Sequence, residues 1–292
     1  MLVVTSPTGQ IGRQVLNRVI DHHEPIRVIA RNPHRLPAQI RERVDVVQGS
    51  HSDPAVVEHA FTGADAVFWL VPPDPRAASL KVAYLDFTRA ACEFFKTQTV
   101  ERVVGVSALG RGVTDNAGYV SASLAVDDLI ASTGVSYRAL TMPSFMDNLL
   151  WQIEPIKNQG VFFSPLSADR KVPSCATRDI ARVAATLLLD SSWSGVGSVP
   201  VLGPEDLSLN DMALIMSEVL GQLVHYQQIS FDAYKAQLSD RGMSEAMSQA
   251  MVDMMRAKDA GLDNAEPRTP RASTHTSFGQ WCREVLKPAV LA

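Results

Sequence analysis

The sequence has few cysteines, and they follow no pattern. Its 292 residues include only three, which are scattered along the chain: Cys92, Cys175 and Cys282. A disulfide framework needs paired cysteines, and a zinc site of the CxxC kind needs two of them close together. The sequence therefore predicts neither disulfides nor a metal site, and it favours a reducing compartment, the cytoplasm.

Long apolar runs and dense basic runs are also missing. No apolar stretch approaches the ~20 residues of a membrane span. The first strand-like run begins at Leu2, so we expect no basic-then-apolar leader before it. Lys and Arg number 27 against 31 Asp and Glu, a formal net charge of -4, and form no cluster. We therefore expect neither a membrane nor nucleic acid as a partner.

What the sequence does contain is an apolar content of 46%, typical of a globular protein. In its first half, apolar strand-like runs alternate with helical periodicity. The predicted strands are 2–5, 26–30, 44–47, 66–71, 102–106 and 136–140, and the longest predicted helix is 77–95. Near-continuous apolar strands separated by helices predict a parallel sheet covered on both faces. Right-handed crossovers then give a doubly wound, Rossmann-type α/β fold.

The second half departs from this rhythm. The periodicity there predicts helices at 151–160, 208–220, 231–238, 244–258 and 278–286, with strands near 199–202 and 225–229. The helix at 244–258 carries Met247, Met251, Met254 and Met255. Methionines at helical spacing suit an adaptable core, and they also suit a broad apolar pocket.

The first twelve residues carry the most informative motif. After the strand-like run come Ser6-Pro7-Thr8-Gly9-Gln10-Ile11-Gly12 and then a helical pattern. Strand, glycine turn and helix open a dinucleotide-binding βαβ unit, whose helix N-terminus attracts a pyrophosphate. The usual form of this motif is Gly-x-x-Gly-x-x-Gly, and Ser6 stands at the position of its first glycine. Because Pro7 follows Ser6, we expect extended backbone angles for Ser6. An ordinary glycine turn without a ligand is the alternative.

The end of the second strand has no acidic residue. An acidic side chain there holds the ribose hydroxyls of NAD, whereas an Arg accommodates the 2′-phosphate of NADP. This chain has Ala30-Arg31-Asn32-Pro33 at that point. The planar guanidinium of Arg31 suits a phosphate, so the sequence favours NADP(H), with a solvated surface Arg as the alternative.

These segments and several later ones resemble the NmrA-like branch of the atypical short-chain dehydrogenase/reductases. The similar segments are Ser6–Gly12, Ala30–Pro33, Gln48-Gly49-Ser50, Tyr137–Asn148, Thr177–Ala185 and Leu202-Gly203-Pro204-Glu205. The resemblance implies a Rossmann lobe and a smaller α+β C-terminal lobe, which we place at 1–148 and 149–292, with 174–195 packing back on the first. It also implies an NADP(H) site. Family members include quinone and azo reductases, and regulators that bind nucleotide without turnover.

The resemblance and the strand ends together predict the site. The expected cofactor-binding residues are Ser6, Thr8, Gly9, Gln10, Ile11, Gly12, Arg31, Ser50, Leu70, Val71, Pro72, Ser107, Pro143 and Phe145. The expected substrate pocket comprises Tyr119, Phe145, Trp151 and Phe162. Trp69 is interpreted as a wall of the cofactor cleft or as strand core. His51 could approach adenine, but an exposed loop histidine is the favoured interpretation.

Several departures from the family pattern concern catalysis. Ser50 replaces an Asp, Thr141 replaces an Arg, and no Tyr-x-x-x-Lys occurs, since Tyr119 is followed by Val-Ser-Ala-Ser. The cofactor itself carries the hydride, and the protein positions the two reacting rings. Ser107 ends the fifth predicted strand and Tyr119 lies just beyond it, so we expect these two to be the catalytic side chains. A half-buried packing residue is the alternative for Tyr119. The predicted function is NAD(P)H-dependent reduction of a quinone-like, aromatic or enone small molecule. The alternative is a non-catalytic NADP-binding redox sensor acting through a protein partner, and the sequence leaves a homodimer open.

Overall fold

The chain divides into two compact units. The structure, a computed structural model, describes residues 1–97, 100–112 and 115–292. The first unit consists of residues 1–108, 122–141 and 180–199, and the second of 109–121, 142–179 and 200–292. The return to the first unit thus covers 180–199, where the sequence analysis expected 174–195. Residues 109–121 and 142–148, expected in the first lobe, belong to the second unit.

The first unit is built on a seven-stranded sheet with the strand order β10-β6-β5-β4-β1-β2-β3. Its strands are β1 (Leu2–Thr5), β2 (Ile26–Ala30), β3 (Asp45–Gln48), β4 (Ala66–Trp69), β5 (Arg102–Val106), β6 (Ser136–Thr141) and β10 (Val196–Pro200). Neighbouring strands from β3 to β6 are parallel. This order is that of the doubly wound Rossmann fold, which confirms the predicted fold class. The run near 199–202, assigned to the second half of the chain, instead overlaps β10 of this sheet.

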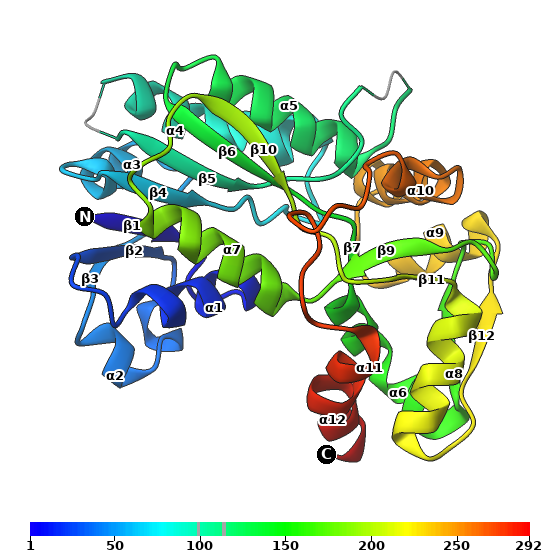
Figure 1. Ribbon diagram of the computed structural model, residues 1–292. Coiled ribbons are helices and arrows are strands. Elements are labelled where there is room, and N and C mark those ends of the chain that lie inside the picture. Colours follow the sequence, from blue (N-terminus) through cyan, green and yellow to red (C-terminus); the bar gives the residue numbers. More distant parts are fainter. Residues whose placement is uncertain (98–99, 113–114) are drawn as a thin grey trace. The chain divides into compact units, whose positions relative to one another are not determined.

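Helices cover both faces of this sheet (Figure 1), with α3, α4 and α5 on one face and α1 and α7 on the other. The helical segments are α1 (Gln10–Val19), η1 (Pro33–Arg35), α2 (Ala38–Arg41), α3 (Pro54–Phe61), η2 (Lys81–Asp86), α4 (Phe87–Thr97), α5 (Tyr119–Ala131) and α7 (Thr177–Leu189). The helix expected at 77–95 begins at Lys81, as a π-helical stretch that leads into α4. Pro72 and Pro73 precede it without regular structure, and Pro75 lies in a turn, so the helix begins only after residue 77.

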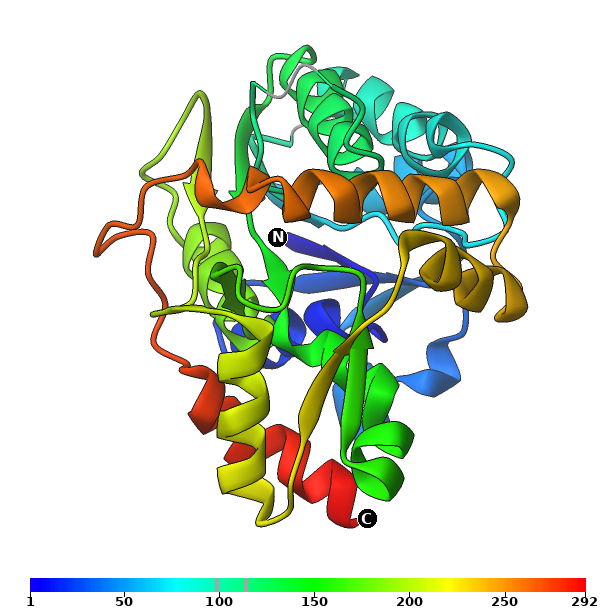
Figure 2. The same ribbon diagram turned by 90° about the vertical axis from the view of Figure 1, so that its right-hand side faces the viewer.

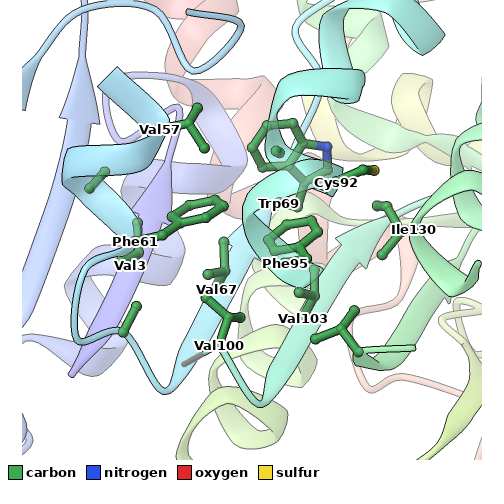
Figure 3. Close-up of a cluster of buried hydrophobic side chains, with 14 of the residues drawn as sticks. Val3, Val57, Phe61, Val67, Trp69, Cys92, Phe95, Val100, Val103 and Ile130 are labelled. Atoms are coloured by element: carbon green, nitrogen blue, oxygen red, sulfur yellow. The ribbon is translucent and has the colours of Figure 1, made fainter. Parts of the chain in front are cut away.

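Aromatic rings fill the layer between the sheet and the helices α3, α4 and α5 (Figure 3). Phe61 stacks on Phe95 at 5.1 Å between ring centroids, and Trp69 meets Phe95 edge-on at 6.1 Å. Trp69 is 1% exposed and belongs to this cluster. Such pairs add about 0.5–1.5 kcal/mol to the energy of area burial. Of the two interpretations of Trp69, the structure supports strand core.

The turn between β1 and α1 brings two backbone segments into close contact. A Cβ on Gly12 would lie 2.1 Å from the carbonyl oxygen of Ser6. The side chains of Ile11, Val15 and Leu16 bury α1 against the sheet, so glycine at position 12 lets the helix approach. Ser6 has φ 52°, in the left-handed region that non-glycine residues rarely adopt. The extended conformation predicted for Ser6 is therefore wrong, because the close turn imposes the geometry of the missing glycine.

The second unit contains two small sheets and its own hydrophobic core. Its strands are β7 (Ser144–Phe145), β8 (Val161–Ser164), β9 (Val172–Cys175), β11 (Asp206–Leu207) and β12 (His225–Gln228), in the orders β11-β9-β7 and β12-β8. Its helices are η3 (Met146–Gln152), α6 (Ile153–Gln159), α8 (Leu209–Leu220), α9 (Phe231–Asp240), α10 (Glu245–Asp259), η4 (Leu262–Asn264), α11 (Phe278–Trp281), η5 (Cys282–Leu286) and α12 (Lys287–Leu291). Figure 2 shows α8 alongside β12. The helix expected at 151–160 is split between η3 and α6.

Two of the four methionines of α10 are core residues of this unit. Met247 is fully buried, and Met255 packs against the core that includes Phe162 and Trp281.

All three cysteines are buried and free. None of the helices in the described ranges has the length and apolar character that a membrane crossing requires.

We predict that Gly12→Ala destabilises the protein far more than Gly9→Ala. A Cβ at position 12 would collide with backbone atoms of Ser6 and Thr5, which cannot yield without moving the strand. At Gly9 the nearest atom, also the Ser6 carbonyl oxygen, is 3.3 Å away. We expect a loss of about 3 kcal/mol in the free energy of unfolding for Gly12→Ala, and under about 1 kcal/mol for Gly9→Ala. Urea denaturation measures both, and equal losses would contradict the close contact.

Candidate nucleotide-binding site

The carboxyl ends of β1 and β4 are joined by one buried hydroxyl. The Oγ1 of Thr5 donates to the carbonyl oxygen of Phe68 at 2.9 Å and accepts from the N–H of Leu70 at 3.0 Å. Thr5 is fully buried. Thr5 is not among the residues predicted from the sequence, although a hydroxyl at the end of an apolar strand is a signal for such a role. Thr5 therefore ties the end of β1, where the glycine turn begins, to the end of β4.

The turn itself is shaped to receive a phosphate group. The N–H of Gly9 donates to the Ser6 carbonyl at 3.0 Å, and α1 begins at the next residue. Gly9 caps this helix without any side-chain hydrogen bond, and its first turn contains no acidic residue. A Cβ at Gly9 would have only Ser6 within 4 Å, so the outer side of the turn is open. A pyrophosphate therefore fits here, against the positive end of the helix dipole.

Arg31 lies where β2 ends and is exposed. The segment after it is held in a tight turn, because the Asn32 side chain accepts from the N–H of His34 at 3.1 Å. Within the described ranges, Arg31 forms no ion pair with an acidic side chain. A charged group free to bind an anion thus stands at the strand end where NADP-binding proteins place one.

His51 follows β3 and is only 6% exposed, so the expectation of an exposed loop histidine is wrong. Its ring lies edge-on to Trp69 and Phe87, at 5.1 and 4.8 Å between centroids. Its Nε2 lies 2.9 Å from the carbonyl oxygen of Leu70. Burial, together with the charge of Arg31, lowers the pKa of His51 to about 4, although the hydrogen bond to Leu70 opposes this shift. At neutral pH the uncharged ring therefore donates to Leu70 and anchors that backbone.

The segments around His51 contain further predicted cofactor-binding residues. The Ser50 Oγ accepts from the Ser52 N–H at 3.3 Å and lies 2.8 Å from the Ser52 Oγ. Leu70, Val71 and Pro72 are half-buried. The chain after β4 is therefore held from two sides, by the Thr5 hydroxyl and by the His51 ring.

Ser107 directly follows β5 and contacts a buried carboxylate. Its Oγ donates to Asp127 Oδ2 at 2.5 Å, and the Tyr137 hydroxyl donates to Asp127 Oδ1 at 2.6 Å. Asp127 lies on α5 and is 3% exposed. Because the Ser107 proton is directed at Asp127, Ser107 offers a ligand its lone pairs rather than its proton. Neither Asp127, the partner of Ser107, nor Tyr137, which donates to the same carboxylate, is among the residues predicted from the sequence.

The second unit contains five further predicted residues: Tyr119, Pro143, Phe145, Trp151 and Phe162. Tyr119 is 8% exposed, and burial raises its pKa to about 12, so its phenol is protonated at neutral pH. Pro143 is buried and Phe145 half-buried. Trp151 is 79% exposed. Phe162 is 1% exposed and packs on Tyr226 at 5.2 Å, which argues against direct contact with a substrate.

The fold and the glycine turn together define a dinucleotide-binding protein of the Rossmann class. A family model described as NAD(P)H-binding matches residues 7–191, and the model of the NmrA-like family matches residues 122–276. The chain belongs to the NmrA-like family and is an NAD(P)H-binding protein, as the resemblance of its motifs predicted. No group of metal-ligating side chains occurs among the residues for which the structure gives positions.

Similar proteins include reductases of several kinds. The chain is 28% identical to the (4-alkanoyl-5-oxo-2,5-dihydrofuran-3-yl)methyl phosphate reductase of Streptomyces griseus, covering 82% of this chain and 80% of that protein. It is 26% identical to the NAD(P)H azoreductase of Xenophilus azovorans, covering 87% and 86%. The crystal structure of the Escherichia coli NADPH-dependent quinone oxidoreductase QOR2 has the same fold, with a TM-score of 0.77, 20% identity and coverage of 98% and 100%.

We predict that the protein binds NADPH more tightly than NADH, and that Arg31→Ala removes most of the difference. A charge-assisted hydrogen bond to the 2′-phosphate contributes about 1.5–3 kcal/mol, or roughly tenfold to a hundredfold in affinity. Calorimetric titration of both nucleotides measures the effect. Arg35→Ala, a nearby exposed arginine, is the matched control. Equal affinities of the wild type for the two nucleotides would contradict the assignment of Arg31.

We also predict an acid-sensitive contribution of His51 to stability. Its pKa is lower in the folded protein than the ordinary 6.5 of an unfolded chain, so the unfolded state binds the extra proton. The free energy of unfolding therefore falls as the pH drops from 6.5 towards 4, by about 3 kcal/mol from this residue. His51→Gln retains an N–H donor for Leu70 but does not titrate. Its denaturation midpoint should fall less steeply in this range, and a parallel pH profile would contradict the prediction.

Proposed function

We propose that this protein is a cytoplasmic NADPH-dependent reductase, which transfers a hydride to an electron-poor conjugated small molecule such as a quinone, an azo compound or an enone. The proposal depends above all on the open glycine turn at the carboxyl end of β1, with exposed Arg31 at the end of the neighbouring strand β2. Free, buried cysteines suit a reducing compartment.

The names of the similar proteins support this class of acceptor. One acts on a dihydrofuranone that also carries an alkanoyl group, and another is an azoreductase. A C=C bond conjugated to carbonyl groups and an N=N bond both accept a hydride at one atom and a proton at the next. The hydride comes from the reduced nicotinamide, whose chemistry the protein directs by positioning and by excluding other reactions.

The residues of the chain divide this work. Gly9 and the first turn of α1 would hold the pyrophosphate, and Arg31 the 2′-phosphate. Tyr119 keeps its proton at neutral pH, as an ordinary tyrosine does, and burial raises its pKa further, to about 12. We assign it the role of donor to the reduced acceptor. Phe145 would contribute to the apolar substrate pocket.

The decisive measurement is the loss of NADPH absorbance with a panel of quinones, azo dyes and enones. We predict turnover by the wild type with at least one of these classes. Tyr119→Phe should lower kcat at least about tenfold, since general acid catalysis contributes about 10²–10⁴. The affinity of this variant for NADPH should stay unchanged.

Tyr226→Phe is the control, because that hydroxyl is bonded to the backbone carbonyls of Ser164 and Leu166. It should retain the wild-type kcat. If no acceptor is reduced while NADPH binding is demonstrated separately, the reductase proposal fails. A nucleotide-binding redox sensor, which needs no turnover, would then be the better interpretation.

A further inference from the structure

Three side chains from β6, α5 and the residue after β5 form a buried hydrogen-bonded group, which we call the Asp127 network: Tyr137, Asp127 and Ser107. The Asp127 carboxylate accepts from both hydroxyls, one at each oxygen, at 2.5 and 2.6 Å. All three residues are at least nine-tenths buried. All three lie within the first unit, and Ser107 follows the carboxyl end of β5, the kind of strand end where Rossmann proteins bind their ligands.

The backbone of β5 is adapted to this network. A Cβ on Gly105 would lie 2.2 Å from the Tyr137 hydroxyl oxygen and 2.7 Å from an atom of its ring. Glycine at position 105 therefore lets the Tyr137 ring lie across β5 and reach Asp127 on the helix above it. The N–H of Ser107 donates to the Leu140 carbonyl at 2.9 Å, which fixes the backbone that carries the hydroxyl.

The network decides how Ser107 can bind a ligand. A serine hydroxyl has one proton and two lone pairs. The Ser107 proton is directed at the carboxylate, so only the lone pairs are available on the other side of the oxygen. A carboxylate is an acceptor alone, and it therefore holds the hydroxyl in this one orientation.

We infer that Asp127 is a positioning residue that makes Ser107 a hydrogen-bond acceptor for the carboxamide N–H of the nicotinamide. The inference rests on the proposed function, in which Arg31 at the end of β2 binds the 2′-phosphate. The adenosine half then lies over β2 and β3, and the nicotinamide half lies over β4–β6 on the other side of β1. An acceptor at this point selects the carboxamide over a group that has a carbonyl and no N–H.

The test compares two nucleotides that differ in this group alone. NADP⁺ carries the carboxamide, and its 3-acetylpyridine analogue carries a methyl ketone with no N–H. Calorimetric titration of the wild type should show NADP⁺ binding about tenfold more tightly. Ser107→Ala, which removes the acceptor, should bring the two affinities to within about twofold. Equal binding of the two nucleotides by the wild type would overturn the inference.

Asp127→Asn tests the positioning role directly. The isosteric amide can donate to the Ser107 oxygen, which frees the serine proton to point outwards. The preference for NADP⁺ over the analogue should then fall severalfold, a change that a purely structural role for Asp127 would not cause. Asp128→Asn, on the exposed side of the same helix, should retain the full preference.

A folded Asp127→Asn protein with an unchanged preference would overturn the inference. If that variant fails to fold, the comparison of wild type with Ser107→Ala still decides the acceptor role. These titrations contain no electron acceptor. Their outcome is thus independent of whether the protein reduces a quinone, and failure of the proposed reductase activity would leave it unaffected.

Discussion

The close contact between Gly12 and the Ser6 carbonyl is the constraint on which the nucleotide site depends. It brings the first turn of α1 against the end of β1, and it holds Ser6 in a left-handed conformation. The helix dipole can then act on a phosphate bound at the turn. Without this approach, the proposed phosphate position at Gly9 would lack the aligned N-terminus of α1.

Side chains beneath the proposed ligand surface hold both halves of the site in place. Thr5 and His51 fix the backbone at Leu70 on the proposed adenosine side. Asp127 fixes the Ser107 hydroxyl on the other. Buried polar groups of this kind must find partners, because an unpaired one costs about 1–3 kcal/mol. Their hydrogen bonds therefore define one geometry for the strand ends before any ligand binds.

The departures from the family pattern acquire physical meaning in this setting. Ser6 adopts the conformation that a glycine would have at the same place. Ser107, with its proton directed at Asp127, suits a binding role better than proton donation. Tyr119, buried and protonated at neutral pH, remains the candidate donor. The missing Tyr-x-x-x-Lys removes none of the proposed cofactor-binding residues. It leaves Tyr119 as the one candidate proton donor.

The sequence by itself determined the doubly wound sheet, the helix that follows the glycine turn, and the family. Each depends on local patterns: apolar strands of four to six residues, helical periodicity at Ile11, Val15 and Leu16, and short motifs. Only the tertiary structure decided that Ser6 is left-handed, that His51 is buried, and that β10 completes the first sheet. It alone joined Ser107 to Asp127, 20 residues along the chain. Periodicity records which residues are buried, whereas the partner of a buried polar group is set by the packing of segments that are distant in sequence.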